Sequence, residues 1–478
     1  GAPYHVLAHA VAVVATSTWA AIKGREALAV TWSDPIHGDE STESFDRQCR
    51  TLLQSEGQVV RDDGDFDTAA ANAARTVTAT YEIPFVAHCP LEPPNCLAHV
   101  TEDACHVIVA TQMPSGVSRG IHSALGIDRE KIRVDMTRVG GGFGRRLTVD
   151  YAVEAALISK QAGHPIKLVW TREDDLRHDF YRPAGHHEMT AALDAEGQPV
   201  AWTQRLASAS KYYRRPNMPD ENLWQSELYA DDFPAAIIPN LRLEYFPVKS
   251  GIPRGSWRAP AHTANAFVIQ SFLDEIAAAT DQDPLALRLD LLGESRELPY
   301  GNHGGPTFNP GRLSRLLRFL AEEADYGRER PAGQGLGLAC HFTFGGYSAH
   351  AIEVAVSDAG ELSILRVIGA IDCGFAVHPN AVIAQMEGST IDGLSTALNL
   401  EITMAAGRIR QSNFHDYPLL RLAEAPLTME MHILPWDEEP TGVGEIGIPT
   451  VAPALTNAIF NATGKRIRRL PIGDQLRA

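Results

Sequence analysis

The sequence predicts an α+β protein in which two mixed lobes follow a short α/β unit. Strand-like alternation and helix-like periodicity succeed one another along the chain, mostly in short elements. The length of 478 residues exceeds what one compact core usually supports, which favours two or three domains. Residues 294–335 are rich in Gly, Pro and charged residues, and they form the best internal boundary.

The first predicted elements form the tail of a small α/β unit. The apolar residues 10–15 favour a strand, residues 19–28 a helix capped by Ser17 or Thr18, and residues 29–32 a second strand. The chain opens with Gly1 and not Met, so we expect a substantial N-terminal portion to be missing from it. The predicted organisation is a small unit at 1–35, a polar linker at 36–74, a first lobe at 75–293, a linker at 294–335 and a second lobe at 336–478.

Both lobes are predicted to mix strands and helices. Polar and apolar residues alternate over 76–81 as in a half-buried strand, and a long apolar helix is expected over 263–280. Asp283 followed by Pro284 marks the start of another helix. The other predicted elements are strands at 105–111, 132–139, 351–356 and 362–371, and helices at 116–125, 148–162, 380–398 and 453–463.

Composition and charge exclude several functions. The formal net charge of −17 argues against a nucleic-acid surface or a polybasic membrane anchor. The apolar run at 10–15 is too short to span a bilayer. None of the six cysteines forms a C-x-x-C pair, so we interpret most as buried thiols and leave open a disulfide among Cys89, Cys96 and Cys105.

The glycine-rich turn at 442–447 contains the first candidate for chemistry. Glu445 lies between Gly444 and Gly447 with apolar sequence on both sides. Glycines allow close approach of the backbone, and desolvation raises the pKa of a carboxyl group toward the range of a general base. Glu445 is therefore the predicted catalytic residue.

A second glycine-rich stretch, at 139–146, follows a predicted strand and precedes a helix. Consecutive glycines let backbone N–H groups approach an anion, and Arg145 and Arg146 suit phosphate. The stretch lacks both the G-K-[ST] ending and the G-x-G-x-x-G spacing of common nucleotide sites. A phosphate-bearing cofactor and a plain strand-to-helix turn with solvated arginines both remain open.

Several ordered motifs together resemble a known family. They are G-G-G-F-G-R-R at 140–146, R-G-S-W-R-A-P at 254–260, D-C-G at 372–374 followed by Q-M-E-G at 385–388, and G-V-G-E at 442–445. In this order they resemble the large, molybdopterin-binding subunit of molybdenum hydroxylases. Within the xanthine dehydrogenase and aldehyde oxidase superfamily, the chain looks most like the isoquinoline 1-oxidoreductase beta-subunit group, from about residue 10 onward. The first unit would then be the tail of a hammerhead-like domain.

The resemblance implies a role for each matching residue. Glu445 would deprotonate a molybdenum-bound water or hydroxide as it attacks an electron-poor carbon. The metal would be held by the cofactor's dithiolene, with no side chain of this chain as a ligand. The residues implied in cofactor binding are Gln112, Gly141, Gly142, Phe143, Gly144, Arg145, Arg258, Gln385 and Gly444.

The resemblance also implies a hydroxylase that oxidises an aldehyde or an N-heteroaromatic carbon with water. The expected cofactor is molybdopterin cytosine dinucleotide, with [2Fe-2S] clusters on a partner subunit. Expected further partners are a cytochrome acceptor and a separate N-terminal chain that completes the site, and the expected location is periplasmic, with cytoplasmic as the alternative. A purine substrate is doubtful because Arg145-Arg146-Leu147 replaces the G-K-E pattern of xanthine-oxidising relatives. His378 and Ser389 also depart from the common pattern.

Two other functions stay open from the sequence. The chain could be a metal-free scaffold with the same fold, or a hydrolase that uses Cys89 and His88, although no orienting third group is evident. Residues 177–179 and 186–188 contain His and acidic side chains, but their spacing matches no common zinc motif, so we expect a structural role.

Overall fold

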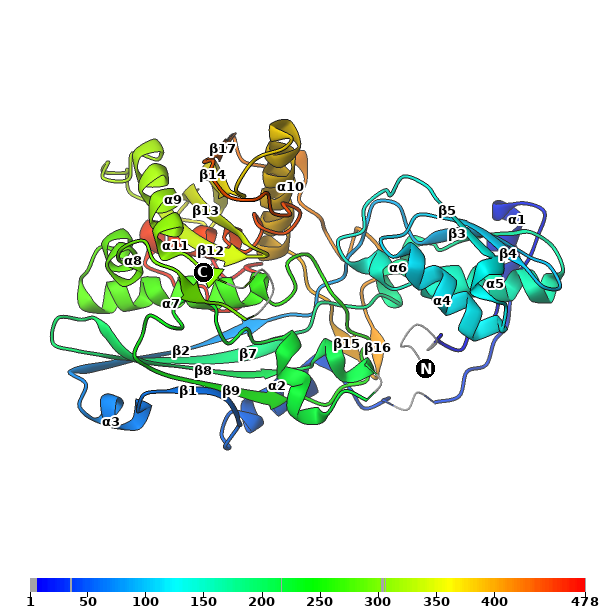
Figure 1. The fold of residues 1–478 in the computed structure, drawn as a ribbon, viewed down its shortest axis with the longest axis horizontal. Helices are drawn as coiled ribbons and strands as arrows, with labels where there is room; N and C mark the ends of the chain where they lie inside the picture. Colours follow the sequence, from blue (N-terminus) through cyan, green and yellow to red (C-terminus); the bar gives the residue numbers. More distant parts are fainter. Residues whose placement is uncertain (1–6, 35–36, 216, 302–304, 306, 478) are drawn as a thin grey trace.

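The computed structural model describes residues 7–34, 37–215, 217–301, 305 and 307–477. The chain forms a large body that contains the C-terminus and, beside it, a smaller body (Figure 1). The observed mixture of helices and sheets confirms the predicted α+β class.

A five-stranded sheet forms the base of the large body. Its strands are mostly antiparallel, with one parallel pair, β8 and β9. The predicted strand at 76–81 lies within its edge strand. In spatial order the strands are β1 (Gln58–Asp63), β9 (Asn240–Pro247), β8 (Pro199–Ser208), β7 (Gly185–Leu193) and β2 (Arg75–Ile83).

A four-stranded sheet forms the upper layer of the large body. Its helix α11 (Val451–Thr463) packs closely on β12 because Gly337 has no side chain: an added Cβ would lie 2.2 Å from the carbonyl oxygen of Ala454. In spatial order the strands are β12 (Gln334–Thr343), β13 (Gly346–Val356), β14 (Leu362–Asp372) and β17 (Thr428–Ile433), with β14 and β17 parallel. The other helices of this layer are α9 (Pro310–Glu323) and α10 (Pro379–Leu398).

Helix α7 (His262–Thr280) lies between the two sheets (Figure 1). It packs on β2 and β7 from one side and on β12 and α11 from the other. One continuous hydrophobic core therefore joins both sheets through α7. The segment 294–335 does not separate two lobes as expected, because α9 lies within it and packs against the upper sheet.

The smaller body is an insertion between β2 and β7. It contains a four-stranded sheet in the order β5-β4-β3-β6, covered by α4 and α5, with its own core. Its elements are β3 (Asn95–Val100), β4 (Cys105–Val109), α4 (Pro114–Leu125), β5 (Ile132–Met136), α5 (Asp150–Ala162) and β6 (Ile166–Val169).

The N-terminal segment differs from the prediction. Helix α1 (Thr18–Glu26) forms with Ser17 as its N-cap, as expected, but residues 10–15 and 29–32 are not strands. Most of their side chains are exposed, and no neighbouring strand of the described chain pairs with them. A strand needs a hydrogen-bonding partner, so local sequence alone did not decide these elements. The prediction for residues 1–6 lies outside the described residues.

The expected linker at 36–74 also belongs to the fold. Strand β1 pairs with β9, and the other two elements of the stretch pack on the lower sheet.

All six cysteines are buried and free, so the disulfide left open by the sequence does not form. Within the described ranges, no helix has the length and apolarity needed to cross a bilayer. The remaining elements are α2 (Thr42–Leu52), α3 (Phe66–Ala71), α6 (Arg172–Arg177), α8 (Pro284–Leu292), β10 (Leu298–Pro299), β11 (Thr307–Phe308), β15 (Met404–Ala405), β16 (Arg408–Ile409), and short 3-10 turns at Arg129–Lys131, Arg145–Leu147, Lys211–Arg214, Asp220–Ser226 and Leu422–Glu424.

Candidate active site

Arg258 connects the segments that the sequence analysis singled out. Its Nε donates to the carbonyl oxygen of Gly444 at 2.8 Å, and its Nη2 donates to Gln385 Oε1 at 3.0 Å. Its backbone N–H donates to the carbonyl oxygen of Phe143 at 2.9 Å. The predicted residues from the glycine loop, α10 and the Glu445 turn therefore meet around one buried guanidinium.

Two further side chains complete the contacts of Arg258. Ser389 Oγ accepts a hydrogen bond from Nη2 at 2.7 Å, and Asp392 Oδ2 lies 3.4 Å from Nη1. From the sequence, Ser389 was only a departure from the common pattern. Its hydroxyl is an additional acceptor that fixes the guanidinium. His378 is the N-cap of α10, where its Nδ1 accepts from the N–H of Ala381, so it takes the place of the more common asparagine.

The glycine loop is held by Gln112 and by a close backbone contact. Gln112 Oε1 accepts from the N–H groups of Gly144 and Arg146, both at 3.2 Å. Gly144 has a φ of 109°, and a Cβ there would lie 1.7 Å from the carbonyl oxygen of Ser256. Only glycine fits this position, because both the positive φ and the close approach exclude a side chain.

The two arginines after the loop are not solvated, and their guanidinium groups are not free for phosphate. Arg145 is fully buried and makes two hydrogen bonds of 2.9 Å with Asp150. Arg146 is also fully buried, and its guanidinium donates to the carbonyl oxygens of Ala110, Gly141 and Glu92. This corrects the interpretation of both side chains as phosphate ligands. The backbone of the loop still reaches the candidate site, because the carbonyl oxygen of Phe143 accepts from the N–H of Arg258.

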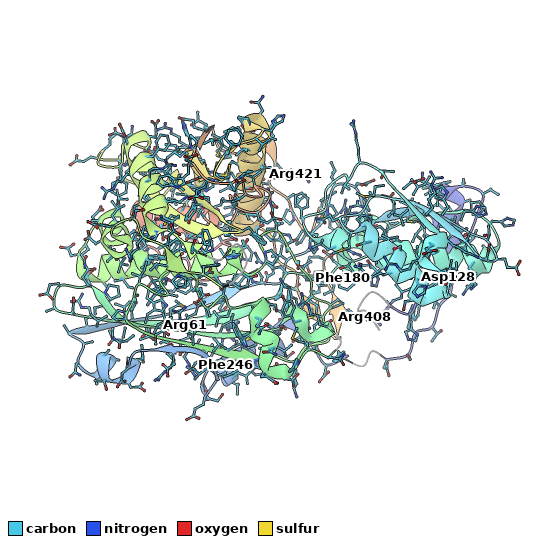
Figure 2. The ribbon with its side chains drawn as sticks, in the orientation of Figure 1. Arg61, Asp128, Phe180, Phe246, Arg408 and Arg421 are labelled. Atoms are coloured by element: carbon cyan, nitrogen blue, oxygen red, sulfur yellow. The ribbon has the colours of Figure 1, made fainter. Side chains whose placement is uncertain are left out.

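Arg145 also lies where the two bodies meet. Its Nε is 3.1 Å from Asp179 Oδ1, and its guanidinium carbon is 5.1 Å from the centre of the Phe180 ring. Phe180 is labelled in Figure 2 at the junction between the bodies. Burial disfavours the charge of Asp179, but His88 and Arg145 outweigh it and hold the pKa of this carboxyl below its ordinary value. The sequence analysis had placed Asp179 in a structural segment without identifying these partners.

His88 and Cys89 do not form a nucleophilic pair. His88 Nδ1 lies 2.9 Å from Asp179 Oδ1, and Nε2 lies 2.7 Å from the carbonyl oxygen of Ser256. Both ring nitrogens thus face oxygen acceptors and neither is free to take a proton from the thiol. Burial raises the pKa of Cys89 to about 12, so the thiol stays protonated at neutral pH. The hydrolase interpretation loses its support.

Glu445 is half-buried beside the Arg258 cluster. Burial raises the pKa of its carboxyl group above the ordinary value, and the positive charge of Arg258 opposes this rise. Within the part of the chain that the structure describes, no group donates a hydrogen bond to the carboxylate. The carboxylate is therefore free to accept a proton from a molecule bound at the site.

The backbone just before Glu445 is not covered by other groups. An added Cβ at Gly388, Gly442 or Gly444 would meet no atom within 4 Å. The polar side chain of Gln385 and the partly exposed ring of Phe143 lie beside the same guanidinium, that of Arg258. This arrangement suits a polar, extended cofactor that carries its own metal, because it offers space and hydrogen-bonding groups rather than a set of metal ligands.

Family comparison now defines the class of protein. Residues 53–291 match the molybdopterin cofactor-binding domain family, and residues 320–426 match a second molybdopterin cofactor-binding domain. The first match alone covers half of the chain, so the chain belongs to the molybdopterin cofactor-binding family. This confirms the relationship to molybdenum hydroxylases that the motifs predicted.

Individual relatives agree with this class. The isoquinoline 1-oxidoreductase subunit beta of Brevundimonas diminuta is 30% identical, over 99% of this chain and 61% of its own length. The membrane-bound aldehyde dehydrogenase [pyrroloquinoline-quinone] of Gluconacetobacter polyoxogenes is 28% identical, over 98% of this chain and 63% of its own length. The chain thus spans about three fifths of the length of these curated relatives.

Solved structures share the fold. The crystal structure of quinoline 2-oxidoreductase from Pseudomonas putida 86 superposes with a TM-score of 0.79 at 15% sequence identity. The match covers 97% of this chain and 84% of that chain. At this identity the likeness establishes the fold alone, which is that of molybdenum hydroxylase large subunits.

Proposed function

We propose that this chain is the catalytic, molybdopterin-binding part of a hydroxylase that oxidises an aldehyde or an N-heteroaromatic carbon. The observation that carries the proposal is the meeting of Phe143, Gln385 and Gly444 around Arg258, next to an unpaired and half-buried Glu445. The family membership of residues 53–291 and the names of the relatives support the same chemistry.

Each part of the site has a defined task in this proposal. The cofactor would supply the two-electron oxidation that removes the carbon-bound hydrogen together with its bonding electrons, and water would supply the oxygen atom. Glu445 accepts the proton that the water-derived oxygen loses as it adds to the substrate carbon. Arg258 holds the carbonyl group of Gly444, which fixes the position of the neighbouring Glu445. The loop backbone at Phe143 and Gly144, together with Gln112, Gly141, Gly142, Gln385 and Gly444, would line the cofactor, whereas Arg145 would hold the loop in place through Asp150.

The substrate side of the site is the exposed ring of Phe143. Its centre lies 5.9 Å from the guanidinium carbon of Arg258, and the ring is 37% exposed. A planar substrate can stack on this ring while its reactive carbon faces the open space beside Glu445. Flat azaarenes and aromatic aldehydes fit this arrangement.

The electrons taken from the substrate must leave the chain. We propose that they pass to [2Fe-2S] clusters on a partner subunit and from there to a cytochrome, that the cofactor is the cytosine dinucleotide form, and that the complex is periplasmic. The relative from Brevundimonas diminuta, named as a subunit beta, supports an assembly of several chains. Purification of the native complex, with spectroscopic detection of iron–sulfur clusters and cell fractionation, tests this part.

The central test replaces Glu445 by Gln in the natively assembled protein. We expect molybdenum and released pterin nucleotide, both measured by mass spectrometry, to stay at wild-type levels. Turnover of an aldehyde and azaarene panel should fall by about 10²- to 10⁴-fold, the usual contribution of a general base. Glu439→Gln is the matched control, because Glu439 is exposed nearby in the same segment. Survival of activity in Glu445→Gln would reject the assignment of the base, and a wild-type complex without molybdenum would favour a metal-free scaffold.

A further inference from the structure

A second cluster of chemically capable side chains lies in the interior of the large body and does not include Glu445. It consists of Asp232, His262 and His341. His262 Nδ1 lies 3.0 Å from His341 Nε2 and 3.5 Å from Asp232 Oδ2, and the distance from His341 Nε2 to Asp232 Oδ2 is 3.9 Å. The three residues come from a loop, from the start of α7 and from β12, and all are at least 94% buried, since their exposed fractions are 6%, 0% and 3%.

Among the described residues, the buried carboxylate of Asp232 has only the two imidazoles as basic neighbours. Asp232 Oδ1 accepts a hydrogen bond from the Tyr300 hydroxyl at 2.6 Å, but Oδ2 has no hydrogen-bond partner among the described residues. No Lys or Arg in the described part of the chain forms an ion pair with Asp232. A buried carboxylate usually has a cationic partner or a metal ion, because an isolated charge in the interior is costly.

The two imidazoles lie close to each other and to the carboxylate. His341 is also buried and directs its Nε2 toward Asp232 Oδ2, at 3.9 Å. Its Nε2 and the Nδ1 of His262 face each other at 3.0 Å, which only one shared proton can satisfy. His262 Nε2 has no hydrogen-bond partner among the described residues.

We propose that Asp232, His262 and His341 together bind one Zn²⁺ ion. Bonds of about 2.0–2.1 Å from zinc to nitrogen or oxygen place tetrahedral ligand atoms roughly 3.3–3.4 Å apart, close to the three observed separations. Two neutral imidazoles and one carboxylate form a common zinc ligand set, and the Tyr300 hydroxyl orients the carboxylate from behind. A zinc ion would neutralise Asp232 and occupy the space between the three ligand atoms.

The zinc site would fix the loop that carries Arg258. His262 follows Arg258 by four residues, through Ala259 and Ala261, which have φ values of 52° and 61°. A left-handed backbone is unfavourable for alanine and persists only where the surroundings hold it. The Thr263 hydroxyl donates to the carbonyl oxygen of Arg258 at 3.0 Å, which ties the start of α7 to the same turn. The metal therefore has a structural role, because it connects the two sheets next to the active site.

The test measures zinc in the natively assembled protein after dialysis against a weak chelator. We expect one zinc per chain in the wild type, retained through dialysis, and at least a roughly tenfold loss in Asp232→Asn and His341→Gln. His350→Gln is the matched control, because His350 is equally buried in the neighbouring strand β13 but is hydrogen-bonded to Thr450 and Thr390. Wild-type protein without stoichiometric zinc, or unchanged zinc in both variants, overturns the proposal.

X-ray absorption at the zinc edge of the wild type decides the outcome if a variant fails to fold. We expect only nitrogen and oxygen neighbours with two imidazole rings. A sulfur neighbour would place the ion elsewhere and reject the site. Strong chelators should also lower the thermal midpoint of the wild type by several degrees, and added zinc should restore it. Zinc and molybdenum are counted separately, so this result is independent of the proposed oxidation chemistry.

Discussion

At the scale of single residues, Glu445 is under two opposing influences. Burial disfavours its charged form, whereas Arg258 favours it. The net effect is a carboxyl group whose pKa lies above its ordinary value but which a nearby cation keeps from rising further. Such a group can be charged at neutral pH and still accept a proton during the reaction.

The pH profile of the reaction should report this balance. We expect kcat/KM to rise with pH as Glu445 loses its proton, with an apparent pKa above that of an ordinary glutamate. Because Arg258 lowers the pKa of Glu445, Arg258→Gln should shift the acid limb to higher pH, and Arg258→Lys should shift it less. The measurement is kcat/KM from pH 4 to 9 in the three proteins. An acid limb that is the same in all three would contradict the coupling.

Glu154 allows a test of stability at the same scale. Burial raises its pKa from an ordinary value of 4.5 to about 7, although the Trp170 indole N–H donates to it. The folded state therefore holds a proton that the unfolded state releases, so this group's contribution to stability falls as pH rises from 4.5 through 7. Glu154→Gln should remove that loss, so the variant should unfold at higher urea than wild type at pH 8 and at about the same urea at pH 4.5. Glu130→Gln, an exposed position, should change neither midpoint.

At the scale of elements, α11 and β12 pack backbone to backbone. At Gly337 an added Cβ would lie 2.2 Å from the carbonyl oxygen of Ala454 and 2.2 Å from the nitrogen of Ala458. These are main-chain atoms of a helix, so they cannot move aside as a flexible side chain would. Helix α11, which follows the Glu445 turn, can thus pack directly on β12 because Gly337 has no side chain.

Gly337→Ala should consequently separate α11 from β12. We expect a loss of about 1–3 kcal/mol in the free energy of unfolding, as for other overpacked interiors. Gly327→Ala is the matched control: a Cβ there meets no atom within 4 Å, so its effect should stay within about 0.5 kcal/mol. Urea unfolding followed by circular dichroism measures both. Equal stability of the two variants would show that the helix can shift freely on the sheet.

At the scale of the whole molecule, Arg145 joins the small body to the large one. It pairs with Asp150 at the start of α5 and with Asp179, which itself contacts His88 and thereby the Ser256 segment. Since all of this lies in the interior, removal of the guanidinium leaves Asp150 without its cationic partner and Asp179 with His88 alone.

Arg145→Met should weaken the junction and lower the free energy of unfolding by about 3–5 kcal/mol. We expect the urea transition to split into two steps, because each body has its own core. Arg133→Met, at an exposed ion pair of the small body, should cost less than about 1 kcal/mol. A single transition for Arg145→Met at the wild-type midpoint would contradict this role of the arginine.

The sequence predicted those features that depend on neighbouring residues. The helices α4, α5, α7, α10 and α11 were found from periodicity and caps. Glu445 was singled out from its glycine-rich turn, and its role as a base stays a prediction. The insertion of the small body was missed because the pairing of β2 with β7 spans about a hundred residues without a local signal. The contacts of Asp179 and Ser389, and the buried position of Arg145, depend on the same long-range packing. The cluster of Asp232, His262 and His341 has no sequence spacing that would identify it.

The position of Arg258 has a consequence for how the protein is made. Its partners at Gln385 and Gly444 lie 127 and 186 residues further along the chain. Contacts between such distant positions close long loops, and they form late in folding because the loss of chain entropy comes before the contacts compensate for it. An incompletely folded chain therefore has no partial site. During biosynthesis, cofactor insertion must follow the folding of the large body. The folding of the chain itself therefore decides when the cofactor can be inserted.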